Sequence, residues 1–145
     1  MESPKKVINE LLVEVFNHIL SIEGQTLKRR GVKLSMNEVH VLEAIRETNV
    51  PTMTNIAKKL RITVGTLTTS INRLVEKGFA KRHREKLDRR KVVISLTNSA
   101  FNVLKIHDEF HDEMIDAVFA DMNLKEDAVL LQSLENLSDY FKNKY

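Results

Sequence analysis

Two short amphipathic segments, joined by a tight corner and followed by a charged hairpin, constrain the fold of this chain more than any other feature. Segments 52–60 and 63–77 each begin with a threonine, a good helix N-cap, and Arg61-Ile62 forms the corner between them. The β-prone runs at 79–83 and 92–96 flank a charged loop and predict a β-hairpin. This order predicts a helix-turn-helix with a β-wing.

Longer helical stripes surround this middle region. Apolar residues recur every three or four positions in four further segments, 7–28, 36–48, 98–121 and 127–141. Capping-box patterns at 35–38 and 123–126 open two of these helices. Four Gly and two Pro leave little material for β-turns. We therefore expect a mainly α fold with a small β-wing, in which long N- and C-terminal helices flank a winged helix-turn-helix.

The composition excludes several classes of protein. Hydrophobic residues make up 42% and charged residues 30%, which is typical of a globular chain, and zero Cys excludes disulfides, thiolate zinc sites and a cysteine nucleophile. No apolar run fits a membrane span, and the N-terminus does not resemble a secretory signal, so we expect a cytoplasmic protein without a membrane partner. There is no nucleophile elbow, Gly-rich phosphate loop or pair of catalytic carboxylates, so we expect neither an enzyme nor a cofactor.

Positive charge is concentrated between residues 52 and 95. This segment holds twelve Lys and Arg but three Asp and Glu, a net +9, and the rest of the chain is −6 because the total is +3. A basic middle between acidic ends is typical of a module that binds a polyanion such as double-stranded DNA. A solvated charged surface, or a winged helix that binds protein instead of DNA, is the alternative.

The second short helix has one face suited to the major groove of DNA. Its apolar stripe, which we expect to be buried, is Val64, Leu67, Ile71 and Leu74. The opposite face carries short hydroxylated side chains and one Arg, which can approach base edges closely. Threonine is a mediocre helix former, so helix stability explains this composition poorly. The predicted DNA contacts on the two short helices are Thr54, Thr63, Gly65, Thr66, Thr69, Asn72 and Arg73.

The wing loop supplies a second set of predicted DNA contacts. Arg84, Arg89, Arg90 and Lys91 lie on the hairpin, where they can reach the minor groove or its phosphates. Asp88 lies two residues before Arg90 and can brace the guanidinium through a charge-assisted hydrogen bond. An ordinary charged hairpin tip with a weak surface ion pair is the alternative. We add Arg84, Asp88, Arg89 and Arg90 to the predicted site.

These motifs resemble the MarR family of winged-helix transcription regulators. The resemblance rests on the helix-turn-helix 54–77, the wing sequence Asp88-Arg-Arg90 and the strand 92–97, and it spans essentially the whole chain. It implies a homodimer whose first, fifth and sixth helices interlock. One departure is Arg61, where many helix-turn-helix corners have Gly, so we expect this corner to open differently.

The apolar stripes of the terminal helices support the same dimer. They are wider than a monomeric winged helix could cover, and pairing would bury them and favour a palindromic DNA site. We therefore expect a single MarR-like chain over 1–145, with a DNA-binding region at 35–97 and dimerisation helices at 5–31 and 98–145.

Within the family, the segment from Thr63 to Thr69 and the positions Met36, His40 and His107…Met114 look like the fatty-acid-synthesis repressors of FabT type. That resemblance implies control of fatty acid biosynthesis, with a long acyl chain on acyl carrier protein as co-repressor. Plain core packing is the alternative for the side chains that we predict to line an effector pocket. These are Phe16, Ile19, Leu20, Met36, His40, Phe101, Leu104 and Phe110.

Two other effector classes stay open for such a family member. One is a small aromatic or phenolic ligand that releases the regulator from DNA. The other is a metal ion, because His107 and His111 are four residues apart on one helix and His40 or His18 could join them. Packing or hydrogen bonding of these histidines is the simpler interpretation, and we predict no metal site.

Overall fold

The computed structural model describes residues 1–122 and 126–144, in two compact units, Met1–Asp108 and Glu109–Tyr145. The capping box predicted at 123–126 therefore lies largely outside the described residues. The described helices include none with the length and apolar character that crossing a bilayer requires.

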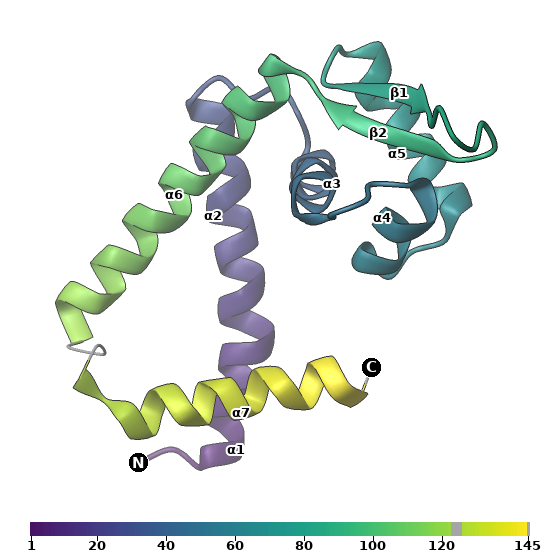
Figure 1. Ribbon diagram of the computed structural model, residues 1–145. Helices are drawn as coiled ribbons and strands as arrows, with labels where there is room; N and C mark the ends of the chain where they lie inside the picture. Colours follow the sequence, from purple (N-terminus) through teal and green to yellow (C-terminus); the bar gives the residue numbers. More distant parts are fainter. Residues whose placement is uncertain (123–125, 145) are drawn as a thin grey trace. The chain divides into compact units, whose positions relative to one another are not determined.

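The first unit begins with one nearly continuous helical rod (Figure 1). It consists of α1 (Pro4–Asn9), the π-helix η1 (Glu10–Val15) and α2 (Phe16–Arg29). The rod ends at Gly31, whose φ of 91° lets the amide of Val32 bond back to the carbonyl of Leu27 at 3.0 Å. The sequence predicted one helix over 7–28; the π-helical turns inside it were not predicted.

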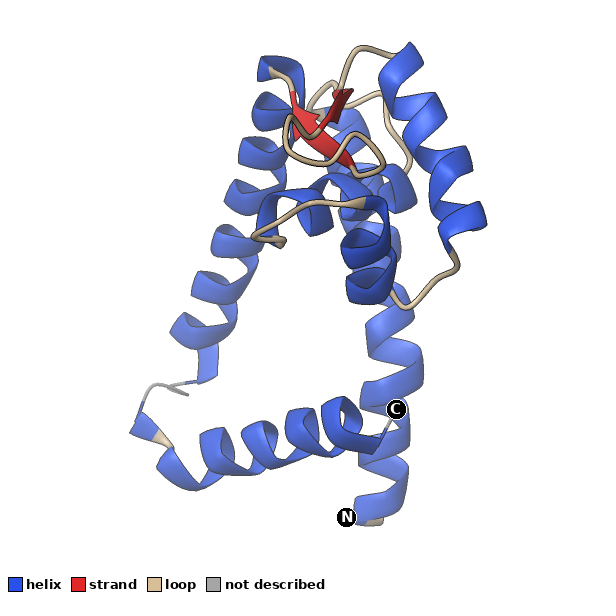
Figure 2. Cartoon of the chain, turned by 45° about the vertical axis from the view of Figure 1, so that its right-hand side comes forward, coloured by secondary structure: helices blue, strands red, loops and turns tan. Residues whose placement is uncertain are grey.

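The winged helix-turn-helix of this unit, which we call the head, follows the rod, and its two strands form a small hairpin beside the helices (Figure 2). Ser35 closes the predicted capping box with Glu38 at the start of α3. The strands pair antiparallel, with Ala80 opposite Leu96. The elements are α3 (Met36–Glu47), α4 (Met53–Leu60), α5 (Val64–Glu76), β1 (Ala80–Arg84) and β2 (Val92–Leu96). The predicted mainly α fold with a β-wing is confirmed.

The corner between α4 and α5 is closed by Arg61 itself. Its φ of 56° and ψ of 42° are left-handed, and the amide of Ile62 bonds to the carbonyl of Ala57 at 3.1 Å. Our expectation that the corner opens differently without Gly is wrong, because Arg61 adopts the conformation for which glycine is usually needed. The helix-turn-helix keeps its corner at the expense of local backbone strain.

The core of the first unit lies under α5. Leu67, Ile71 and Leu74 are 0% exposed, and they pack with residues of α3, α4 and β2. Val64, the fourth member of the predicted stripe, is 44% exposed, because the first turn of α5 extends beyond the edge of the core. The buried stripe fixes which face of α5 points outward.

Two long helices complete the chain. Thr97 precedes α6 (Asn98–Met122), as predicted, and its hydroxyl accepts from the amide of Ala100 at 3.4 Å. In the second unit, Asp127 accepts from the amide of Leu130 at 2.9 Å at the start of α7 (Ala128–Lys144). None of the residues of α7 that the structure describes is buried within one copy of the chain.

Candidate nucleic-acid interface

The outward face of α5 carries the side chains predicted to contact DNA. Thr66, Thr69 and Arg73 are exposed, as are Gly65 and Asn72, and all lie away from the buried stripe. A helix supported on one side and bearing short polar side chains on the other fits the width of the major groove. The predicted orientation of α5 is confirmed.

The threonines of α5 do not all have the same role. Thr63 is the N-cap: its Oγ1 accepts from the amide of Thr66 at 3.2 Å and lies 2.9 Å from Thr66 Oγ1. The hydroxyl of Thr68 donates to the carbonyl of Val64 at 2.8 Å. Helix formation thus explains Thr63 and Thr68, whereas Thr69 lies on the outward face.

The wing places its arginines in a braced loop. Asp88 Oδ1 accepts from both the amide of Arg90, at 3.1 Å, and its Nε, at 3.2 Å. The predicted brace is therefore confirmed, and it orients a side chain that is 92% exposed. Arg84 and Arg89 are exposed on the same hairpin.

A surface pocket of about 520 Å³ lies between the start of α4 and the base of the wing. Thr54, Asn55, Arg90 and Lys91 line it. The N-terminal end of a helix attracts anions, and two cations face the same space, so the pocket is suited to a phosphate group. Sequence reasoning placed Thr54 and Arg90 in the site but missed Asn55, which lines the pocket from the first turn of a capped helix.

An ion pair fixes the end of α5 against the start of α3. The ammonium of Lys77 lies 3.1 and 3.0 Å from the two carboxylate oxygens of Glu38. Burial acts to raise the pKa of Glu38, but the hydrogen bonds from Lys77 and Ser35 outweigh it and hold that pKa below its ordinary value. The contact joins the end of α5 to the rest of the head.

The winged helix-turn-helix matches the MarR family model over residues 34–92. The chain is 30% identical over 116 residues to the transcriptional regulator ZitR of Lactococcus lactis, which covers 77% of this chain and 79% of that protein. The chain belongs to the MarR family. It is thus a DNA-binding transcriptional regulator, as its curated relatives are regulators and not enzymes.

Two solved structures that resemble this chain agree with this assignment. Streptococcus pneumoniae FabT, solved in complex with DNA, superposes with a TM-score of 0.85 at 32% identity, covering 97% of this chain and 99% of that one. A mutant of Escherichia coli MarR in complex with operator DNA gives a TM-score of 0.71 at 21% identity, covering 94% and 99%, and supports the fold. Both proteins were solved on DNA.

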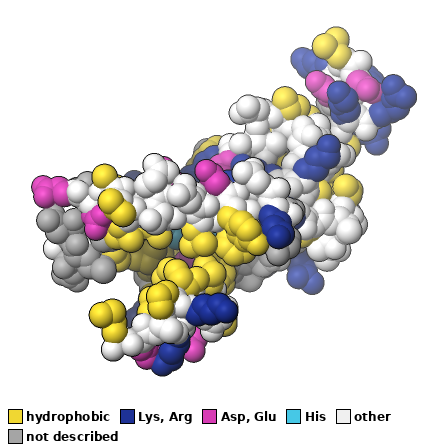
Figure 3. All heavy atoms as spheres, turned by 90° about the horizontal axis from the view of Figure 1, so that it is seen from below, with side chains coloured by type: hydrophobic (Ala, Val, Ile, Leu, Met, Phe, Trp, Pro, Cys, Tyr) yellow, Lys and Arg dark blue, Asp and Glu magenta, His cyan; other side chains and the backbone are white. Residues whose placement is uncertain are grey.

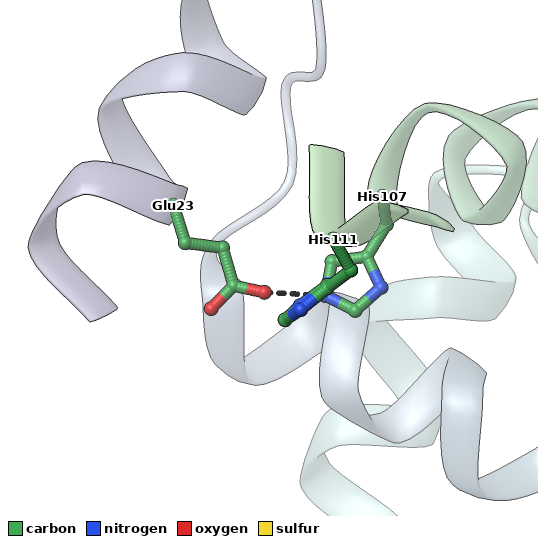
Figure 4. Close-up of side chains that lie close together, drawn as sticks. All are labelled: Glu23, His107 and His111. Atoms are coloured by element: carbon green, nitrogen blue, oxygen red, sulfur yellow. Dashed lines mark hydrogen bonds and ion pairs between the residues drawn. The ribbon is translucent and has the colours of Figure 1, made fainter. Parts of the chain in front are cut away.

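A buried polar contact links the rod to α6 in this MarR-family chain. His107 is 3% exposed, and its Nε2 lies 2.5 Å from Glu23 Oε1 (Figure 4). Its Nδ1 lies 3.1 Å from Glu43 Oε2 of α3, and the ring of His40 is 6.0 Å away. The hydrogen-bonding role foreseen for His107 is confirmed. Carboxylate and imidazole groups are also common zinc ligands, and His111 lies one turn further along α6.

The residues predicted to line an effector pocket have different surroundings. Leu104 belongs to the hydrophobic core of the head, and Met36 packs against that core. Phe16 and Phe101 are 56% and 51% exposed. Ile19, Leu20 and His40 are half-buried, and Phe110 is buried. A lipid-binding role for this set stays a prediction.

Hydrophobic side chains lie open on the surface of the helical rod and, separately, of α7. Figure 3 shows such side chains exposed on the face viewed from below. On the rod they include Val7, Leu11, Leu12, Val15, Phe16 and Ile22, and on α7 they include Val129, Leu134 and Phe141. An exposed set of this kind is unusual for a protein that works as a monomer.

Proposed function

We propose that this chain is a cytoplasmic, homodimeric repressor that binds a palindromic operator and controls fatty acid biosynthesis genes. The observation that carries the proposal is the similarity to FabT over nearly the whole length of both chains. In this proposal a long-chain acyl group on acyl carrier protein is the co-repressor.

In the proposed complex, α5 and the wing contact different parts of the DNA. Thr66, Thr69 and Arg73 contact base edges in the major groove, while Arg84 and Arg90 contact the adjacent minor groove or its phosphates. Thr54, with Arg90 and Lys91, holds a phosphate in the pocket at the start of α4. Base contacts give sequence specificity, and phosphate contacts give affinity and position.

The exposed apolar surfaces support the dimer. Burying the rod and α7 against a second copy would remove these side chains from water, at about 25 cal/mol per Å² of apolar surface. Residues 5–31 and 98–145 are then the dimerisation helices, and 35–97 is the DNA-binding region. Two-fold symmetry sets two copies of α5 about one turn of DNA apart, which selects a palindrome.

Two substitutions test the division of tasks. Arg90→Ala should weaken binding to cognate and random DNA alike and lower the salt dependence of log K, because a phosphate contact is lost. Thr69→Ala should reduce discrimination between cognate and random DNA. Lys33→Ala is the matched control for Arg90→Ala, because it removes a cation outside the head. Thr68→Ala is the matched control for Thr69→Ala, because the hydroxyl of Thr68 donates to a carbonyl of its own helix. Equal losses on both DNAs for Thr69→Ala would contradict the assigned roles.

The co-repressor is tested by selecting bound DNA from a random pool, with and without acyl carrier protein that carries a long acyl chain. We expect a palindromic consensus and tighter binding when the acylated carrier is present. Native mass spectrometry at low salt gives an independent readout. Failure to bind any acylated form would refute the fatty-acid role and leave the DNA-binding role in place.

A metal-responsive regulator is the second candidate, because Glu23 and His107 already meet in a buried contact. Zinc titration of the chelator-treated protein, followed by DNA-binding measurements, separates the two candidates. A zinc-dependent change in affinity that His107→Ala abolishes favours the metal, and an acyl-dependent change without zinc favours the lipid.

A further inference from the structure

The side chains of Asn72 on α5 and Arg82 on β1 are hydrogen-bonded to each other. Nη2 of Arg82 donates to Oδ1 of Asn72. Both residues are exposed, and Asn72 lies on the outward side of α5. Sequence reasoning predicted Asn72 as a DNA contact but did not single out Arg82. The wing strand therefore reaches the reading helix at a position where that helix would meet DNA.

The pleat of β1 explains why Arg82 reaches α5. Side chains two residues apart lie on the same face of a strand, so Arg82 shares its face with Ala80, which is buried against the head. Ile94, its partner on β2, is buried on that face too. Lys81 and His83 point to the opposite face, and His83 bonds to Ser95 there.

The contact fixes which groups the pair can offer to a base. A guanidinium carries N–H donors and no acceptor, so the amide atom of Asn72 that faces Arg82 has to be Oδ1. An asparagine with a free amide reads adenine with both Oδ1 and Nδ2. With one of the two lone pairs of Oδ1 engaged by Arg82, the pair offers a base mainly donors, namely the NH2 group of Asn72 and the other N–H groups of Arg82.

We propose that Arg82 is a specificity-determining residue, and that Arg82 and Asn72 together form a donor-rich pair that selects guanine. Guanine displays two acceptors, N7 and O6, in the major groove, whereas adenine and cytosine display amino groups that would face the donors of the pair. This inference rests on the proposed role of α5 as the helix that reads the major groove.

Selection of bound DNA from a random pool tests the pair with the full-length protein. Asn72→Ala should reduce the preference for guanine at one position in each half-site by about tenfold. Arg82→Ala should shift that position from guanine toward adenine, because Oδ1 of Asn72 becomes free to accept. The control is Lys81→Ala, which removes one cation from the other face of the strand and should leave the base preferences unchanged. Urea unfolding of each variant checks that the fold is retained.

The outcomes separate this inference from the proposed function. If Arg82→Ala and Asn72→Ala both keep the base preferences of the wild type and lower affinity equally for all sequences, the two side chains contact phosphates only and the inference is overturned. If Thr69→Ala still erodes discrimination in that case, α5 reads DNA and only the role of Arg82 fails. If Thr69→Ala also keeps the preferences of the wild type, α5 is not the reading helix and the proposed function fails with it.

Discussion

Replacing Arg61 by glycine should stabilise the head. Arg61 has a φ of 56° and a ψ of 42° at the corner of the helix-turn-helix. A residue with a Cβ atom loses about 1–2 kcal/mol in this left-handed conformation relative to a right-handed one. Glycine avoids that cost but gives up about 0.5–1 kcal/mol, because its unfolded state has more conformational freedom. The net expectation for Arg61→Gly is a gain of about 0.5–1 kcal/mol in the free energy of unfolding.

Urea unfolding at one fixed protein concentration measures this gain, because in the proposed dimer the stability would depend on concentration. Arg61→Ala is the matched control: it removes the same charge and keeps the Cβ atom, so the glycine variant should exceed it in the free energy of unfolding by the same margin of about 0.5–1 kcal/mol. Lys59→Gly, inside α4, should instead cost about 1 kcal/mol. If Arg61→Gly is no more stable than Arg61→Ala, the backbone of the corner is not strained as described.

Three further changes test the packing around the site. Leu67→Ala, at a side chain with no exposure, should lower the free energy of unfolding by about 2–5 kcal/mol in urea titrations. The pKa of Glu38 is lowered, so its stabilising effect is present above the pKa of the unfolded chain and disappears as the pH falls through the folded value. Lys77→Met should therefore flatten the acid limb of a stability–pH curve below about pH 5, and an unchanged limb would count against the ion pair. Glu23→Leu should lower the free energy of unfolding by about 2–4 kcal/mol, because it removes a buried carboxylate from His107. The same change should cost less in a chain that already carries His107→Phe, and simple additivity of the two changes would contradict this coupling.

The sequence predicted the elements of the head because their local signals agree with their packing. The caps at Ser35, Thr52 and Thr63 lie where helices start, and the apolar spacing of α5 matches the core against which it packs. The brace between Asp88 and Arg90 was predictable because two residues so close in sequence can meet whatever the rest of the fold does.

Contacts between residues far apart in the chain could not be predicted from the sequence. The bond between Arg82 and Asn72 depends on how the wing lies over α5, and the one between Glu23 and His107 joins residues far apart in the chain. The left-handed backbone at Arg61 was missed for another reason: propensity favours glycine there, and tertiary packing overrides propensity.

The π-helical segment Glu10–Val15 also affects which chains can pair with the rod. A hydrogen bond from residue i to i+5 encloses one residue more than an α-helical bond does, and one residue corresponds to about 100° of rotation. The apolar side chains before and after the segment are therefore out of phase with a plain α-helix. A second copy of this chain would have its apolar side chains rotated in the same way. In a chain with an uninterrupted α-helix, part of the apolar stripe would point away from the rod. In the proposed homodimer, this one additional residue would therefore favour pairing of two identical chains over pairing with a chain whose first helix is uninterrupted.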